Sequence, residues 1–174
     1  MALFIMQPLA TCSLQPAPYL CCMKILMVCL GNICRSPLAE GILQQKAAEA
    51  GLDWQVDSAG TNGYHTGEPP HHLSIKVAKH NGIDISSQRS RRFIAADLEH
   101  YDLVYAMAAD VLHDMQRIAR HNLDTKKVSL FLEESFPGEA RDVPDPWSGP
   151  EIHYHEVYDI IDRNCDNIIK KYSK

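Results

Sequence analysis

The sequence predicts an α/β fold, a single domain in which a four-stranded parallel sheet is flanked by helices. Short strand-like stretches alternate with longer stretches of helical periodicity along the chain after residue 22, as a parallel sheet with crossover helices requires. The first such stretch, residues 24–28, is apolar almost throughout, which is typical of a strand buried on both faces. The chain has 174 residues, 45% of them hydrophobic, and can therefore fill one core.

Local signals place each element. We expect strands at residues 24–28, 54–58, 102–106 and 128–132. Ser36 is a suitable N-cap, Pro37 suits the first helical position and Gly51 suits a helix stop, so the first helix is expected between them. Further helices are expected at about 70–80, 109–121 and 151–172, where apolar side chains recur at helical spacing.

The first 22 residues differ from the rest of the chain. They contain no charged side chain, three prolines and three cysteines. Their short apolar start has no basic residues beside it, which argues against a secretory signal. Cys21 and Cys22 have poor spacing for zinc, although a regulatory or metal-binding role for them is an alternative. We expect residues 1–22 to be a disordered extension and residues 23–174 to form the domain.

Charge and hydropathy argue against two classes of partner. The formal net charge is −5, which is unfavourable for a nucleic-acid-binding protein. No apolar stretch approaches the roughly 18 residues of a membrane-spanning helix. We expect neither nucleic acid nor a membrane span.

The most informative segment is residues 28–36, in which Cys29 and Arg35 are separated by five residues where the first strand meets the first helix. Backbone N–H groups of such a turn, together with the helix N-terminus, bind phosphate, and a guanidinium adds paired charged donors. The same donors favour a thiolate. A bare pair of this spacing also arises by chance, and a cysteine at a strand end is often only a small buried side chain. In this context we interpret Cys29 as a nucleophile towards phosphorus.

Two loop residues have conformational roles, and one has two possible uses. Gly31 and Asn32 suit a backbone with unusual dihedral angles, left-handed at Asn32, although a plain turn uses the same residue types. The Ser36 hydroxyl could cap the helix, hydrogen-bond to the Cys29 sulfur, or do both.

Four motifs, in this order, resemble the low-molecular-weight protein tyrosine phosphatase family. They are the loop at 28–36, DSAGT at 57–61, GEPP at 67–70 and PDP at 144–146. The likeness runs from about Met23 to Tyr172. It implies a flavodoxin-like sheet of the phosphatase I type and hydrolysis of phosphotyrosine in proteins through a cysteinyl-phosphate intermediate. That mechanism requires no metal and no other cofactor, and the nine histidines are interpreted as surface residues, not as metal ligands.

The resemblance assigns roles to the loop and to one aspartate. Cys29 would attack phosphorus, and the phosphate would be bound by Leu30, Gly31, Asn32, Ile33, Cys34, Arg35 and Ser36. Asp145, the only aspartate between two prolines, is the candidate general acid. Asp-Pro is also an ordinary turn signal, so this role depends on the phosphatase motif.

Other positions complete the expected site. Tyr64 and Trp147 are candidate aromatic walls, since stacked rings favour a flat apolar substrate, although either could be structural or simply exposed. Ser58 and Gln88 would support the loop, and Cys34 could form a reversible disulfide with Cys29 or serve only as a packing residue.

The chain departs from the family pattern at three places. Trp147-Ser148-Gly149 replaces the paired tyrosines that some relatives phosphorylate, which puts that regulation in doubt. Gln88 stands where relatives often have a histidine, and a glutamine cannot titrate. Ala108 stands where an aspartate commonly follows the third strand. We expect an altered supporting shell around an active enzyme.

Three alternatives share the loop or the fold. An arsenate reductase needs additional thiols, and the segment where such relatives carry a cysteine pair has Ser86 and Ser87. Arginine phosphatases tend to have threonine before the second loop cysteine, where this chain has Ile33, whose bulk favours a flat aryl group. A silent phospho-ligand binding module is the non-enzyme alternative, and the intact nucleophile, arginine and acid argue against it.

The expected setting follows from this chemistry. The substrate would be a phosphotyrosine protein, for which a bacterial tyrosine kinase is one candidate. A reducing, cytoplasmic compartment is expected because Cys29 must stay free. We expect a monomer.

Overall fold

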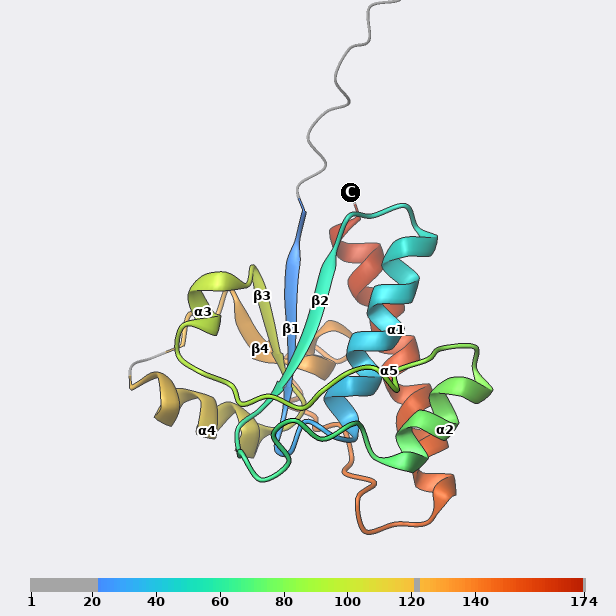
Figure 1. Ribbon diagram of the computed structural model, residues 1–174. Coiled ribbons are helices and arrows are strands. Elements are labelled where there is room, and N and C mark those ends of the chain that lie inside the picture. Colours follow the sequence, from blue (N-terminus) through green and yellow to red (C-terminus); the bar gives the residue numbers. More distant parts are fainter. Residues whose placement is uncertain (1–21, 121–122, 174) are drawn as a thin grey trace, which may run out of the picture.

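The computed structural model describes residues 22–120 and 123–173, and the expectation for residues 1–22 falls outside this part of the chain except at Cys22 (Figure 1). Four strands form one parallel sheet in the order β2-β1-β3-β4. Their bounds are β1 Lys24–Cys29, β2 Gln55–Gly60, β3 Leu103–Ala106 and β4 Val128–Leu130. The predicted fold class is confirmed.

Helices cover both faces of the sheet (Figure 1). They are α1 Arg35–Glu49, α2 His72–His80, α3 Asp97–His100, α4 Ala109–Ala119, the 3-10 helix η1 Phe131–Glu134, and α5 Glu151–Tyr172. Side chains of α1, α2 and α5 pack on one face, and those of α3 and α4 on the other. Strand β1 contributes to both cores, because Ile25 and Met27 point to the first and Leu26 and Val28 to the second.

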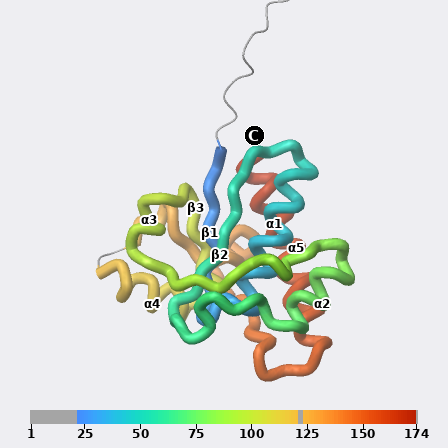
Figure 2. Tube along the Cα trace, viewed as in Figure 1, coloured from blue at the N-terminus to red at the C-terminus, as the bar shows by residue number. Residues whose placement is uncertain are grey.

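This topology opens a site at the carboxyl end of β1. Strand β1 lies between β2 and β3, so the strand order reverses there, and parallel α/β sheets bind ligands at such a point. Cys29 is the last residue of β1. Figure 2 shows that the loop after β2 and the loop before α5 come to this same end of the molecule.

The structure corrects the predicted start of α1. The helix begins at Arg35, and Cys34 occupies the cap position without a side-chain cap bond. Ser36 is therefore inside the first turn, and its hydroxyl donates to the Cys29 sulfur instead of capping the helix. Pro37 follows as the third helical residue. The prediction of capping was wrong because the helix begins one residue before Ser36, which places its hydroxyl past the cap position.

Other boundaries differ by a few residues. Strand β2 runs on to Gly60, which pairs with Cys29 of β1 and bridges to Arg92. Strand β4 ends at Leu130, and the chain turns into η1 where a longer strand was expected. The short helix α3 was not predicted, since four residues carry too little periodicity to signal a helix.

The outer edge of β2 is covered by local groups. The Val56 N–H donates to the side chain of Gln44 on α1 (3.0 Å), which also donates to the carbonyl of Trp54 (3.0 Å). The Ser58 N–H donates to the carboxylate of Asp57 (2.7 Å). The Gly60 N–H donates to the backbone carbonyl of Arg91 (2.9 Å).

Within the described residues, no helix combines the length and apolar character that crossing a bilayer requires.

Candidate active site

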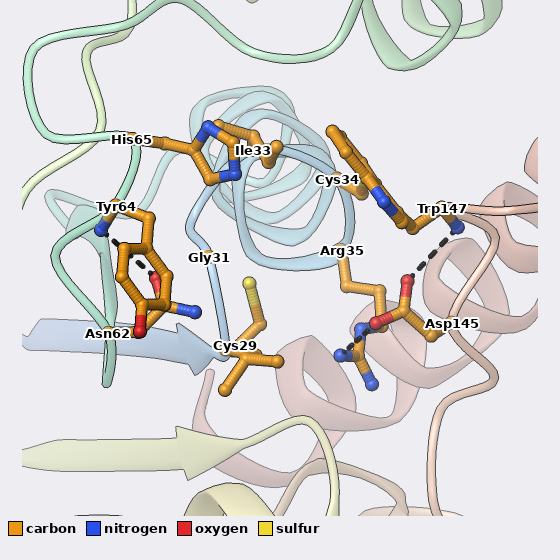
Figure 3. A pocket seen from close by; sticks show the side chains of 11 residues that line it. Cys29, Gly31, Ile33, Cys34, Arg35, Asn62, Tyr64, His65, Asp145 and Trp147 are labelled. Atoms are coloured by element: carbon orange, nitrogen blue, oxygen red, sulfur yellow. Dashed lines mark hydrogen bonds and ion pairs between the residues drawn. The ribbon is translucent and has the colours of Figure 1, made fainter.

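A cavity of about 320 Å³ opens at the carboxyl end of β1, and Cys29 lies in its floor (Figure 3). Three loops form it: the phosphate loop at 29–35, the loop after β2, and the loop before α5. The lining residues are Cys29, Leu30, Gly31, Ile33, Cys34, Arg35, Asn62, Tyr64, His65, Asp145 and Trp147. The structure therefore brings the predicted nucleophile, arginine, acid and aromatic walls to one cavity.

The Cys29 sulfur receives two hydrogen bonds from its own loop. The backbone N–H of Asn32 donates to it over 3.2 Å and the Ser36 hydroxyl over 3.0 Å. Asn32 has a φ of 55°, so the predicted left-handed conformation is confirmed, and it turns this N–H inward. Two donors therefore point at one buried sulfur and fix its position in the loop.

The phosphate loop is held from behind by the end of β2. The N–H groups of Thr61 and Asn62 donate to the carbonyls of Cys29 and Leu30, each over 3.0 Å. A Cβ added at Gly60 would lie 2.8 Å from the Leu30 carbonyl oxygen, so only glycine allows this close approach. The loop backbone is thus fixed by the neighbouring strand.

Arg35 is buried and contacts the loop that carries Asp145, the predicted acid. Its guanidinium donates to the carbonyl of Val143 (3.1 Å) and to the Asp145 carboxylate (2.6 Å). The other Asp145 oxygen accepts from the backbone N–H of Trp147 (3.1 Å). Figure 3 shows the guanidinium turned towards Asp145 and away from the sulfur. In this arrangement Arg35 holds the acid loop beside the cavity.

The two aromatic walls differ in how they are held. The Trp147 ring lies 5.6 Å from the His65 ring and 5.3 Å from the His71 ring, centre to centre, and is half exposed. Tyr64 is 86% exposed, so its ring stands mostly in solvent at the rim. Trp147 is therefore held by contacts with two histidine rings, whereas the Tyr64 side chain is mostly exposed to solvent.

Cys34 is buried on the other side of the loop. Burial raises the pKa of its thiol to about 12, against a weaker opposing effect of the Tyr154 hydroxyl 3.8 Å away. Cys34 therefore stays a thiol at neutral pH.

Ser58 and Gln88, the two residues predicted to support the loop, make different contacts. Ser58 accepts from the Asn32 side-chain amide over 2.8 Å, as the prediction of a supporting role requires. The Gln88 amide nitrogen donates to the carbonyl of Pro37 (3.2 Å) and also hydrogen-bonds to Glu40, and the Gln88 carbonyl oxygen is buried without a partner among the described residues. Its amide lies beside Glu40 and not on the phosphate loop.

Within residues 22–120 and 123–173, no three His, Cys, Asp or Glu side chains are grouped in a way that could hold a metal ion.

Comparison with known proteins decides the family. The family model described as "Low molecular weight phosphotyrosine protein phosphatase" matches residues 24–174. The chain belongs to this family.

Individual relatives agree over most of both chains. The protein is 33% identical over 155 residues to the low molecular weight protein-tyrosine-phosphatase YfkJ of Bacillus subtilis, covering 87% of this chain and 96% of that one. It is 32% identical to the human low molecular weight phosphotyrosine protein phosphatase, covering 85% of this chain and 94% of that one. The crystal structure of YfkJ superposes with a TM-score of 0.79, at 32% identity and coverage of 88% and 98%. The structure of Vibrio vulnificus Wzb in complex with benzylphosphonate superposes with a TM-score of 0.75, at 31% identity and coverage of 86% and 98%.

Sequence reasoning did not find Asn62 and His65, which line the cavity, or Glu40, which lies behind the loop. His65 lies across the phosphate loop at Gly31 and pairs with the Glu68 carboxylate over 2.8 Å. Glu40 on α1 accepts from the Ser58 hydroxyl over 2.6 Å. A histidine followed by a glutamate, or a lone glutamate on a helix, is too common to signal a site, so only the tertiary contacts identify them.

Proposed function

We propose that this protein hydrolyses phosphotyrosine in proteins through a cysteinyl-phosphate intermediate formed on Cys29. The observation that carries the proposal is the buried sulfur with two hydrogen-bond donors, in the floor of a cavity that also contains Arg35 and Asp145. Membership of the phosphatase family supports it.

The reaction takes two displacements. In the first, the thiolate of Cys29 attacks phosphorus, the bond from phosphorus to the tyrosine oxygen breaks, and Asp145 gives its proton to the departing phenolate. In the second, Asp145 takes a proton from water as the water oxygen attacks phosphorus, and the bond from phosphorus to sulfur breaks. Ser36 stabilises the departing thiolate through the same hydrogen bond that it makes at rest.

Arg35 has to exchange partners when the substrate binds. Its guanidinium now contacts Asp145 and the carbonyl of Val143. The phosphate dianion attracts the guanidinium more strongly than a half-exposed carboxylate does, because it carries more charge and a matched pair of oxygens. The exchange places Arg35 on the phosphate and leaves Asp145 available to the leaving oxygen. Loop N–H groups hold the remaining oxygens.

The shape of the cavity favours an aryl phosphate. Ile33, Leu30 and Trp147 give it apolar walls, and Tyr64 stands at its rim. The related Wzb structure contains benzylphosphonate, a phosphonate with an aryl ring. A phosphotyrosine side chain has the same combination of a flat ring and a phosphoryl group.

Cys34 is proposed to protect the nucleophile. A peroxide would oxidise Cys29 to a sulfenic acid, and the Cys34 sulfur would then displace water from it to give a disulfide. Because the high pKa of Cys34 keeps it a thiol, it needs to lose its proton during that step. A thiol reductant would restore both residues.

The remaining expectations are part of this proposal. The substrate is a phosphotyrosine protein, of which a bacterial tyrosine kinase is one candidate, and the reaction takes place in the cytoplasm. The protein works as a monomer and needs no metal or other cofactor.

Steady-state hydrolysis of phosphotyrosine, phosphoserine and phosphoarginine peptides tests the function. We expect the phosphotyrosine peptide to be preferred, Cys29→Ser to abolish turnover, and Asp145→Asn to slow it by roughly 10²- to 10⁴-fold. Preference for phosphoarginine would assign an arginine phosphatase and refute the argument from Ile33. No turnover, with retained phosphate binding, would indicate a binding module.

A further inference from the structure

We propose that Glu40 of α1 is a positioning residue for the phosphate loop, because its carboxylate sets the direction of a hydrogen-bond chain that ends on the Cys29 sulfur. The proposal deepens the proposed phosphatase function and rests on it for its kinetic readout. Glu40 contacts neither the cavity nor the nucleophile, so its effect passes through other residues.

The chain consists of four hydrogen bonds between Glu40 and the sulfur. Glu40 accepts from the Ser58 hydroxyl over 2.6 Å, and the Ser58 oxygen accepts from the side-chain amide of Asn32 over 2.8 Å. The same amide nitrogen donates to the Ser36 oxygen over 3.0 Å. Ser36 in turn donates to Cys29 over 3.0 Å.

A carboxylate fixes this direction because it can only accept. The single hydroxyl proton of Ser58 goes to Glu40, so the Ser58 oxygen can only accept from Asn32. Both hydrogens of the Asn32 amide nitrogen are then used, on Ser58 and Ser36, and its carbonyl oxygen accepts from the Arg91 N–H over 2.9 Å. The side chain is held at every polar atom. These three contacts hold Asn32 in its left-handed conformation, with φ of 55°, in which its backbone N–H donates to the sulfur.

The surroundings of Glu40 bring its pKa close to neutral pH. It is packed by β2, which contributes Asp57 and Ser58, and by the segment with Gln88 and Arg91. Burial raises the pKa of Glu40 to about 7, the Ser58 hydrogen bond lowers it, and Asp57 and Arg91 act in opposite directions. The Gln88 amide, which cannot titrate, adds no charge of its own.

Protonation of Glu40 would reverse the first link. A neutral carboxyl group has a proton to donate, so the Ser58 hydroxyl is no longer required to point at Glu40. Asn32 then loses its fixed acceptor, and the loop N–H on the sulfur is less well aimed. The ordering effect is complete above the pKa and is lost as the pH falls through about 7.

Two substitutions of Glu40 and one control separate the possibilities. Glu40→Gln cannot titrate and, like the protonated carboxyl group, can both donate and accept, whereas Glu40→Ala removes the acceptor. Glu49→Gln is the control, because Glu49 lies on the same helix, is exposed and contacts Gln45. Thermal unfolding shows whether each variant is folded.

The first readout is the pH dependence of kcat/KM for a phosphotyrosine peptide. At pH 6 only about a tenth of a group with a pKa of 7 is ionised, so wild type should lose up to about tenfold between pH 8 and pH 6 through this group. We expect Glu40→Gln to lack that loss, to match wild type at pH 6 within about twofold, to be up to about tenfold slower than wild type at pH 8, and to retain the pH dependence that the substrate phosphate imposes. Glu40→Ala should have a kcat at least about tenfold lower at both pH values. A Glu40→Gln profile identical to that of wild type, or a Glu40→Ala kcat equal to that of Glu49→Gln, would overturn the proposal.

The second readout does not depend on phosphatase activity. The rate at which iodoacetamide alkylates Cys29, followed by mass spectrometry without substrate, reports how well the sulfur is held as a thiolate. We expect slower alkylation in Glu40→Ala and an unchanged rate in Glu49→Gln. If wild type hydrolyses no phosphopeptide but alkylation still responds to Glu40→Ala, the proposed function fails and the positioning role stands. If alkylation is the same in all variants, the positioning role fails.

Discussion

Replacing Ser36 by alanine tests the hydrogen bond on which the nucleophile depends. The Ser36 hydroxyl is fully buried and donates to the Cys29 sulfur over 3.0 Å. A hydrogen bond to a charged group contributes about 1.5–3 kcal/mol, and 1.4 kcal/mol corresponds to a factor of ten. Ser36→Ala should therefore slow reactions at the Cys29 sulfur by roughly 10- to 150-fold. The variant also leaves an Asn32 donor without its partner, which costs about 1–3 kcal/mol in the free energy of unfolding.

Two assays measure this loss. The alkylation rate of Cys29 at about pH 6 should fall by at least tenfold, and the cysteinyl-phosphate should accumulate in rapid-quench experiments, because the sulfur becomes a poorer leaving group. Ser74→Ala is the matched control, since its hydroxyl is equally buried and contacts the Cys34 carbonyl (3.5 Å) but not the nucleophile. An alkylation rate for Ser36→Ala equal to that of Ser74→Ala would refute the assignment of this hydrogen bond.

Three further changes test other parts of the site. Gly60→Ala should cost about 1–3 kcal/mol of stability and at least tenfold in kcat, because the new Cβ would push the phosphate loop; unchanged kcat would show that the loop tolerates the shift. Arg35→Lys should lower kcat/KM by about 10²-fold or more, since lysine lacks the paired donors of the guanidinium. A loss of only a few-fold would contradict the role of those paired donors in binding phosphate. Cys34, with a pKa of about 12, gains thiolate only as the pH rises towards that value, so iodoacetamide at pH 7.5 should label Cys29 completely before Cys34. Equal labelling rates of the two cysteines would show that burial does not protect Cys34.

The parts of the site that sequence reasoning found are those with a local signal. Cys29 and Arg35 lie within one strand-turn-helix unit, so their spacing together with the signals for that strand and helix predicts that both face the same cavity. Asp145 is 110 residues from Arg35, and it was found because two flanking prolines and a family motif mark it. Trp147 follows the same motif.

The parts that were missed or misplaced depend on tertiary contacts. Whether Ser36 caps the helix depends on the residue at which the helix begins, and its hydrogen bond to the sulfur depends on where the thiol lies. The capping preference of serine carries neither piece of information. Glu40 is recognisable only when α1 and β2 are packed together, because its partner Ser58 is 18 residues away. His65 similarly gains its role from the loop against which it packs.

The covered edge of β2 has a consequence for how the protein behaves at high concentration. An open edge strand offers a row of unpaired N–H groups to any other extended chain, and this is a common route to aggregation and domain swapping. Here the N–H groups of Val56, Ser58 and Gly60 are already bound, by a glutamine side chain, an aspartate and a neighbouring backbone carbonyl. A strand from a second molecule would have to displace all three before it could pair. The strand protected in this way is also the one whose end holds the phosphate loop, through the N–H groups of Thr61 and Asn62, so pairing of this edge with a second molecule would act close to the site.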